Sequence, residues 1–271
     1  MGQKTNPTIF RLGLKNTEWN QKYFEKNSEE STLYLYKNIE IQDYIDTIFN
    51  NYNFLIHSCK IEYNYNKSNI IIFYYDFKNI NTNYNLNNKL NKNYITYLIK
   101  DTLIPSLNLY IKNKTINVKI INIKKNFEIN IKKNNLIFVE FKNIQKLFKK
   151  FFKITWQKEL IKLLFVSCYQ GKSSKLIANT ISYCLDKQKK KHNYLLFLLK
   201  KTFNILIKSK FSKIKGIKIV ITGRFNGAPR AKKRVLQIGN IPLQSLKIDI
   251  NYFNSVSYTQ NGTFGVKVWT C

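Results

Sequence analysis

An imbalance of charge constrains this chain more than any other feature of its sequence. The 271 residues include 46 Lys and Arg but only 15 Asp and Glu, so the formal net charge is +31. A compact fold with this charge repels itself unless an anionic partner neutralises it, and a nucleic acid is the simplest such partner. Hydrophobic residues make up 44% of the chain and aromatic residues 15%, which is ample for packed cores. The composition therefore indicates a folded basic protein and argues against a wholly disordered basic tail.

The cations are concentrated toward the C-terminal end. No carboxylate occurs between Asp186 and Asp249, whereas Lys187–Arg234 carries sixteen Lys and Arg and three of the four arginines. These three arginines lie in 223–234, where glycine and proline fix the backbone and guanidinium forks can grip phosphate oxygens. We expect a polyanion-facing surface here, the alternative being a solvated basic loop. The candidate residues are Arg224, Arg230, Lys232, Lys233 and Arg234.

Several other classes of protein lack support in the sequence. No apolar run approaches the ~20 residues that cross a bilayer, so we expect no membrane span. The four cysteines form no C-x-x-C pair and predict neither a zinc site nor a disulfide framework. His57 and His192 are far apart, and a hydrolytic metal site would need carboxylates that the basic region lacks. We therefore predict no enzyme, no catalytic residue, no metal site, no cofactor and no small-molecule substrate.

Periodicity in the first half of the chain predicts a mixture of helix and strand. Apolar residues at three- and four-residue steps predict a short amphipathic helix over 40–50. Asparagine dominates 78–93, which we interpret as a loop or an insertion. The remaining expected elements are strands over 56–65 and 69–77, a helix over 94–103 that ends before Pro105, and a strand over 116–123.

The second half predicts two helices followed by short strands. A lysine-rich stretch comes first, with an expected strand over 136–141 and a helix over 145–166. Helices are then expected over 176–185 and 194–210, the second with an apolar stripe that we predict to be core. Strands are expected over 217–222, 243–252 and 263–269. Two helices packed on this sheet would make an α+β domain, with a boundary near residue 175.

Short motifs at the two ends of the chain resemble a known family. The N-terminal end reads Met1-Gly2-Gln3-Lys4-Thr5-Asn6-Pro7, then Phe10-Arg11-Leu12-Gly13, Trp19-Asn20 and Tyr23-Phe24. The C-terminal motifs are Gly216-Ile217-Lys218-Ile219, Gly223-Arg224-Phe225-Asn226-Gly227-Ala228, Ile241-Pro242-Leu243, Ile248-Asp249-Ile250-Asn251-Tyr252 and Gly265-Val266-Lys267-Val268-Trp269. In this order and spacing they resemble the universal small-subunit ribosomal protein three family of bacterial and organellar type.

The resemblance implies a two-domain binding protein in the head of the small ribosomal subunit, where it lies against rRNA and lines the mRNA entry channel. The implied partners are small-subunit rRNA, mRNA at the channel and neighbouring head proteins. The implied fold is α+β, with a divergent type II K-homology-like domain and a C-terminal α/β domain of two helices and short strands. We expect an N-terminal arm over 1–39, the K-homology-like domain over 40–123, a lineage-specific insertion over 124–175 and the C-terminal domain over 176–271.

The sequence departs from the family pattern in its distribution of glycine. K-homology domains grip single-stranded RNA over a G-x-x-G loop, where missing Cβ atoms let phosphates approach main-chain N–H groups. No glycine occurs between Gly13 and Gly171, so that grip cannot operate as usual. We expect the asparagine-rich 78–93 stretch to replace the loop and to leave the domain an architectural element.

The resemblance also suggests individual RNA contacts. Basic side chains near the channel help family members to open structured mRNA, and here the helix 194–210 would present Lys200 and Lys201. Leu195 and Leu196 take earlier positions where basic residues are expected, so strand separation would be weaker. In the N-terminal arm, Lys4 and Arg11 are expected to contact rRNA, the alternative being an ordered tail with solvent-facing charge.

The expected function is that of a structural constituent of an organellar small ribosomal subunit during translation. A free organellar RNA chaperone or intron-splicing factor is the alternative, because it would share the basic surface. The heavy use of Asn, Lys, Ile, Tyr and Phe is typical of an A+T-rich coding genome. We therefore expect a mitochondrial ribosome, with the plastid as the alternative.

Overall fold

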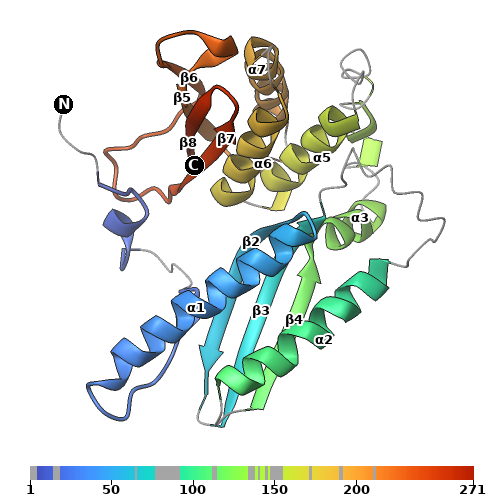
Figure 1. Ribbon diagram of the computed structural model, residues 1–271. Coiled ribbons are helices and arrows are strands. Elements are labelled where there is room, and N and C mark those ends of the chain that lie inside the picture. Colours follow the sequence, from blue (N-terminus) through green and yellow to red (C-terminus); the bar gives the residue numbers. More distant parts are fainter. Residues whose placement is uncertain are drawn as a thin grey trace. The chain divides into compact units, whose positions relative to one another are not determined.

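The chain forms two compact units, each with its own sheet and helices. The computed structural model describes residues 5–14, 19–64, 66–76, 92–111, 115–133, 138–139, 141–143, 146, 155–170, 173–188, 192–209 and 212–271. The smaller unit is Glu18–Asn126, and the larger unit combines Met1–Thr17 with Phe127–Cys271. Figure 1 shows the elements of both units in the colours of the sequence.

The smaller unit is a four-stranded sheet with two long helices over one face (Figure 1). Strands β2 and β3 are antiparallel, whereas β1 runs parallel to β2 and β4 parallel to β3. The order along the sheet is β1-β2-β3-β4. The elements are β1 (Gln21–Lys22), α1 (Glu30–Asn51), β2 (Phe54–Tyr63), β3 (Lys67–Asp76), α2 (Lys92–Tyr110) and β4 (Thr115–Asn122).

The core of this unit is built from apolar residues that alternate along the strands and recur every four residues along the helices. On α1, Ile41, Ile45 and Phe49 step by four and are buried. They meet alternating residues of β2 and β3, such as Ile61 and Ile72, in one hydrophobic cluster. Helix α2 completes the cluster with three buried residues, Ile99, Leu103 and Leu107. The two helices are therefore fixed on the sheet by their apolar stripes.

Helix α2 continues through Pro105, where the sequence predicted an end. Proline lacks an amide hydrogen, so it cannot make the usual helical bond to the carbonyl four residues earlier. Ser106 lies next to this break, and its Oγ is 3.0 Å from the carbonyl oxygens of both Thr102 and Leu103. Burial of Leu103 and Leu107 on either side of the proline holds the helix against the sheet. Packing thus outweighs the local preference.

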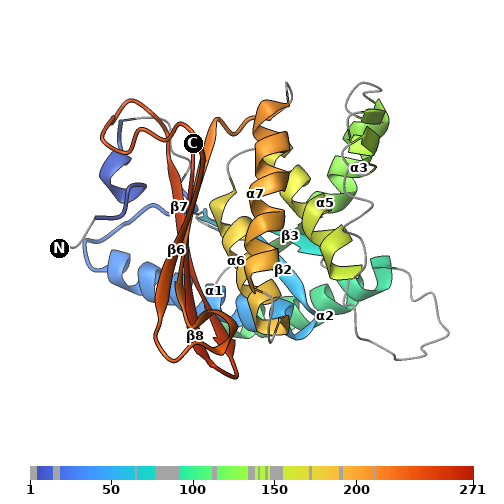
Figure 2. The same ribbon diagram turned by 90° about the horizontal axis from the view of Figure 1, so that it is seen from above.

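The larger unit has an antiparallel sheet of order β6-β5-β8-β7. Helices α6 and α7 cover one face of this sheet, and α5 packs against both helices (Figure 2). The elements are η1 (Ile9–Arg11), α5 (Thr155–Gln170), α6 (Ser174–Lys187), α7 (His192–Lys208), β5 (Gly216–Gly223), η3 (Phe225–Gly227), β6 (Lys232–Gly239), β7 (Asn251–Thr259) and β8 (Gly262–Thr270). Helix α3 (Ile123–Lys133) begins at the end of the smaller unit and continues into the larger one.

The mixture of helices and strands confirms the predicted α+β class, but several segments differ from expectation. The helix expected over 40–50 begins ten residues earlier, at Glu30. The strand expected over 136–141 is wrong where the structure describes it, because Phe138, Val139 and Phe141 are helical. The later part of the helix expected over 145–166 is present as α5. Residues 78–91 lie outside the described residues, and 92–93 belong to α2.

The strand expected over 243–252 is wrong over 243–250 and confirmed only at residues 251–252. Residues 243–250 are turns and irregular chain, and the strand begins only at Asn251. Leu243, Ile248 and Ile250 of this segment pack in a small cluster with Ile241, Trp269 and Cys271 and do not alternate across a sheet. Three of its carbonyls accept hydrogen bonds from the Arg11 side chain. A side chain therefore satisfies backbone groups that a strand would have paired.

Replacement of Gly223 tests the packing at the end of β5. A Cβ atom built on Gly223 would lie 2.3 Å from Cδ1 of Phe264, whose side chain is fully buried. We expect Gly223→Ala to lower the free energy of unfolding by about 1–3 kcal/mol through overpacking, measured by thermal or denaturant unfolding. Phe264→Leu in the same chain makes room for the new methyl group. The double variant should lose less than the sum of the two single losses, and strict additivity would contradict the proposed clash.

Candidate nucleic-acid interface

Helix α7 separates an apolar face from a basic one. Three residues of the predicted core stripe, Leu199, Phe203 and Leu206, are buried, which confirms most of the stripe. Its fourth member, Leu196, is half-buried, and the neighbouring Leu195 is buried in its place. Lys200 and Lys201 are exposed on the other side of the helix. The ammonium of Lys201 lies 4.9 Å from the ring centroid of Phe197, which is itself 48% exposed. In such a pair the ammonium group can bind a phosphate, and the exposed ring can stack on a base.

The arginine-bearing segment begins with a tight turn after β5. Asn226 and Gly227 have φ values of 56° and 78°, so the chain passes twice through the left-handed region. Gly227 adopts this conformation without strain, and asparagine is among the residues that tolerate it best. The guanidinium of Arg224 donates to the carbonyl oxygen of Pro229 at 2.9 Å and ties the two ends of the loop together. Arg224 and Arg230 are both exposed.

Two reciprocal hydrogen bonds fix this turn to the start of α7. The amide of His192 donates to Oδ1 of Asn226 at 3.0 Å, and the amide of Asn226 donates to Nδ1 of His192, also at 3.0 Å. His192 is the first residue of α7, so Asn226 satisfies an amide that has no partner within its helix. Helix and turn therefore cap each other across 34 residues of sequence.

The same contacts define the state of the His192 ring. A backbone amide can only donate, so Nδ1 carries no proton; Nε2 then carries the proton and donates to the carbonyl of Gln188 at 2.9 Å. The ring is 1% exposed and makes edge contacts with Phe225 and Phe264 at centroid distances of 6.2 and 5.1 Å. Neutral His192 is thus a buried positioning residue for the arginine turn.

Strand β6 carries the remaining basic residues at the edge of the sheet. Lys232, Lys233 and Arg234 are all exposed. Pairing with β5 places Lys233 opposite Thr222 and Arg234 opposite Ile221, so these neighbours point to opposite faces. The Arg234 guanidinium lies 6.0 Å from the ring centroid of Phe225 in the turn.

The structure therefore brings most of the predicted C-terminal residues into one neighbourhood. Helix α7 packs against both β6 and η3. We call the seven predicted cations that are exposed on α7, in the arginine-bearing turn and on β6 the basic surface: Lys200, Lys201, Arg224, Arg230, Lys232, Lys233 and Arg234. Asp186 precedes this acid-free stretch, and its carboxylate accepts a hydrogen bond from Ser257 of β7 at 2.6 Å. Burial raises the pKa of that carboxyl group, and the Ser257 hydrogen bond opposes the shift.

Arg11 has a place that the sequence did not indicate. Its side chain is 5% exposed, and its guanidinium donates to the carbonyls of Pro7, Leu243, Ser245 and Ile248 at 2.7–3.0 Å. These bonds tie the N-terminal arm to the irregular chain before β7. Contact of Arg11 with rRNA stays a prediction, and Lys4 lies outside the described residues.

The sequence missed His192 and Asn226 as functional residues. No role was predicted for His192 because no acidic residue lies near it in the sequence. In the structure the partner of its ring is the backbone amide of Asn226. Asn226 stood out only as part of a family motif. No spacing rule links positions 192 and 226, so the clamp becomes visible only in the folded chain.

Comparison with known proteins places this architecture in a class. The sequence model of the family described as "Ribosomal protein S3, C-terminal domain" matches residues 199–270, which include every residue of the basic surface. The chain is 32% identical to the small ribosomal subunit protein uS3c of Euglena longa over 200 residues, or 66% of this chain and 87% of that protein.

Shorter alignments reach further relatives. The uS3c protein of Cyanidium caldarium is 50% identical over 58 residues, or 21% of this chain and 28% of that protein. The uS3 protein of Neorickettsia sennetsu is 33% identical over 97 residues, or 36% of this chain and 43% of that protein. The α+β fold and these similarities define an RNA-binding protein of the small ribosomal subunit. Within that class, the chain belongs to the ribosomal protein uS3 family.

The His192 clamp predicts a specific loss of order in the turn. His192→Leu retains apolar volume beside Phe225 and Phe264 but leaves the Asn226 amide without its acceptor. We expect a destabilisation on the order of 1–3 kcal/mol, together with faster hydrogen exchange at the Asn226 amide. Asn193→Leu, at the exposed neighbouring position, is the matched control. Unchanged exchange at Asn226 in the His192 variant would show that the clamp does not hold the turn.

The Arg11 contacts predict that lysine cannot replace this residue. Lysine keeps the charge, but one ammonium group cannot serve carbonyls of four residues as a planar guanidinium does. We expect Arg11→Lys to lower the free energy of unfolding by on the order of 2 kcal/mol and to expose the arm to protease. Arg230→Lys, at an exposed position, should stay within about 0.5 kcal/mol of the parent protein. Equal changes in the free energy of unfolding for the two substitutions would contradict the proposed role of Arg11.

Proposed function

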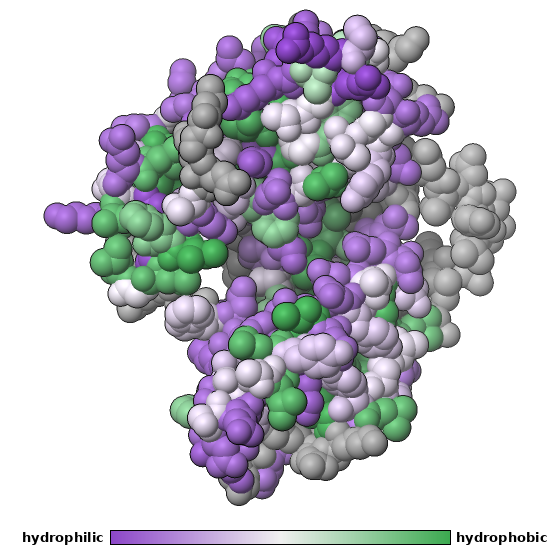
Figure 3. Space-filling model, turned by 60° about the vertical axis from the view of Figure 1, so that its left-hand side comes forward, coloured by the Kyte–Doolittle hydropathy of each residue, from purple (hydrophilic) through white to green (hydrophobic). Residues whose placement is uncertain are grey.

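We propose that this chain is a structural constituent of an organellar small ribosomal subunit that binds rRNA in the head and lines the mRNA entry channel. The observation that carries this proposal is the basic surface, in which a buried clamp holds an arginine turn beside a lysine-bearing helix. Figure 3 shows hydrophilic and hydrophobic groups interspersed on the surface of each unit. Membership of the uS3 family supports the ribosomal role.

For the entry channel, we propose that Lys200 and Lys201 face the passing mRNA and that the arginine turn and β6 contact RNA phosphates. Arginine forks and lysine ammonium groups bind phosphate without reading sequence, which suits a surface that must accept any message. Leu195 and Leu196 stand where basic residues are expected in the family, so this part of α7 adds no charge to the surface. We accordingly expect a weaker ability to open structured mRNA. Lys4 in the arm is proposed as a further rRNA contact. Arg11 is buried with its guanidinium bonded to four backbone carbonyls, so we propose that it holds the arm in place.

For the smaller unit, we propose a divergent type II K-homology-like domain over 40–123. Its support is the antiparallel pair β2 and β3, followed by α2 as the crossover to β4, which is parallel to β3. The absence of glycine between Gly13 and Gly171 favours an architectural role over the usual grip on RNA. The arm over 1–39, the insertion over 124–175 and the C-terminal domain over 176–271 remain parts of this proposal.

The organelle is proposed from the relatives and from the composition. Several relatives carry the organellar name uS3c, which favours the plastid over the mitochondrion. The biased composition and the divergent K-homology region of the sequence suggested the mitochondrion. Mass spectrometry of ribosomes purified separately from the two organelles distinguishes these locations.

A free RNA chaperone or intron-splicing factor is the competing function, since it would use the same cations. We propose no catalysis, in keeping with the structural role of ribosomal proteins of this family. Within the described residues, no helix has both the length and the apolar character needed to cross a membrane. Crosslinking to intron RNA in place of small-subunit rRNA would favour the competing function.

Removal of four cations tests the role of the basic surface. Each phosphate contact adds about −0.7 to −0.9 to the slope of log affinity against log salt concentration. Replacing Arg230, Lys232, Lys233 and Arg234 with Ala should therefore flatten that slope by about 3 for small-subunit rRNA, with little change in melting temperature. The control removes the same charge from exposed lysines of the smaller unit, namely Lys22, Lys26, Lys67 and Lys119. Equal slopes for both variants would show that binding follows net charge and not this surface.

A further inference from the structure

The first half of helix α1 exposes an apolar face. Its large side chains have unusually high exposed fractions: Leu33 59%, Leu35 46%, Tyr36 60% and Ile39 59%. Leu33, Tyr36 and Ile39 step by three and so lie within one arc of the helix surface. The buried residues of α1 begin only at Asn38. These apolar groups therefore contribute nothing to the core of the unit.

Aromatic contacts fix this part of α1 in place. The ring of Tyr34 stacks on Tyr23 at a centroid distance of 5.3 Å and contacts Tyr63 of β2 at 5.1 Å. Tyr34 lies between Leu33 and Leu35, so it anchors the turn that presents them. The apolar face is thus carried by an anchored helix and is available as a binding surface.

The charge of this region is opposite to that of the whole chain. Residues 25–46 contain six acids and two lysines, a net charge of −4 within a chain of +31. The acids are Glu25, Glu29, Glu30, Glu40, Asp43 and Asp46, and the lysines are Lys26 and Lys37. Phosphate would be repelled here, and so would the same face of a second copy. Charge complementarity therefore selects a basic protein as the occupant.

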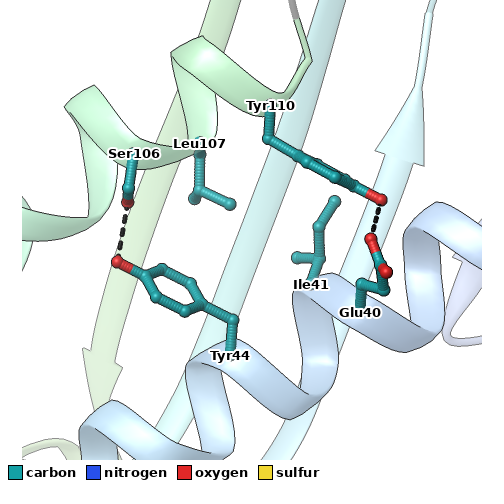
Figure 4. A pocket seen from close by; sticks show the side chains of 6 residues that line it. All are labelled: Glu40, Ile41, Tyr44, Ser106, Leu107 and Tyr110. Atoms are coloured by element: carbon teal, nitrogen blue, oxygen red, sulfur yellow. Dashed lines mark hydrogen bonds between the residues drawn. The ribbon is translucent and has the colours of Figure 1, made fainter.

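An apolar pocket extends the face toward α2 (Figure 4). It has a volume of about 260 Å³ and is lined by Glu40, Ile41, Tyr44, Ser106, Leu107 and Tyr110. Tyr44 donates to Ser106 at 2.9 Å, and Tyr110 donates to Glu40, so hydroxyl bridges join the two helices beside the pocket. Hydrogen bonds from Tyr110 and Tyr36 lower the pKa of Glu40 and so keep an anionic group at its rim.

We propose that the outward face of α1, with the α1–α2 pocket, binds a basic protein segment that inserts an apolar side chain. This inference rests on the proposed function, because the expected occupant is a neighbouring protein of the small subunit. Leu33, Tyr36 and Ile39 supply apolar area, and the pocket accepts one side chain. Glu40 and Asp43 pair with Lys or Arg that flank this side chain.

Photo-crosslinking in assembled small subunits tests the proposal. The full chain carries benzoylphenylalanine in place of Tyr36 or, as a control, in place of Tyr258 on β7, which is 76% exposed. We expect the probe at position 36, and not that at 258, to form a crosslink to one basic small-subunit protein. Crosslinks from position 36 to rRNA, to a second copy or to the larger unit of the same chain would overturn the proposal, as would no crosslink.

A charge reversal separates this inference from the proposed function. Asp43→Lys, in the chain that carries the probe, should lower the yield of the protein crosslink by at least about tenfold, because like charges then meet. Asp101→Lys, at an exposed position of α2 outside the pocket lining, should leave the yield unchanged. If the parent chain is absent from small subunits, the proposed function fails. If it is present but Asp43→Lys leaves the crosslink unchanged, only the α1 surface is refuted.

Discussion

Electrostatic self-repulsion is the constraint on which the rest of this structure depends. A net charge of +31 opposes folding because the cations repel one another. Burial of apolar side chains must outweigh this repulsion until an anionic partner neutralises the charge. The sheets and helices supply that burial, with fully buried side chains such as Ile61 and Phe203. The cations of the basic surface lie on the exposed side of α7, in a loop and on an edge strand. Folding therefore leaves these charges in water and adds no desolvation cost for them.

Two side chains replace regular backbone pairing where this arrangement requires irregular chain. Arg11 satisfies carbonyls in the segment before β7, and His192 accepts the amide of a turn that belongs to no strand. Both residues are buried, and the side chains of both form hydrogen bonds to backbone groups. Irregular backbone whose polar groups are hydrogen-bonded can hold a defined shape before any ligand arrives.

The sequence predicted those elements whose residues alternate or step regularly. Strands β2, β3, β4, β5 and β8 and helices α6 and α7 lie close to the predicted ranges. Strand β6 was missed because its exposed Lys232, Lys233 and Arg234 show no apolar alternation. The start of α1 was missed because Leu33 and Ile39 are apolar but exposed, which blurs an amphipathic pattern. The cations of the site were recognisable from composition, whereas the 192–226 clamp depends on tertiary contact and leaves no local signal.

The two units differ in the kind of ligand that their surfaces can accept. The larger unit presents cations beside a rigid turn, which suits phosphate. The smaller unit lacks glycine, which removes the close backbone approach that a K-homology grip needs, and its α1 is acidic and apolar, which disfavours RNA and suits a basic protein. On the two proposals made above, RNA would be attracted to one unit and repelled at α1. This uneven distribution of charge limits the orientations in which a highly basic protein can bind an RNA surface. Non-specific attraction alone would allow any orientation.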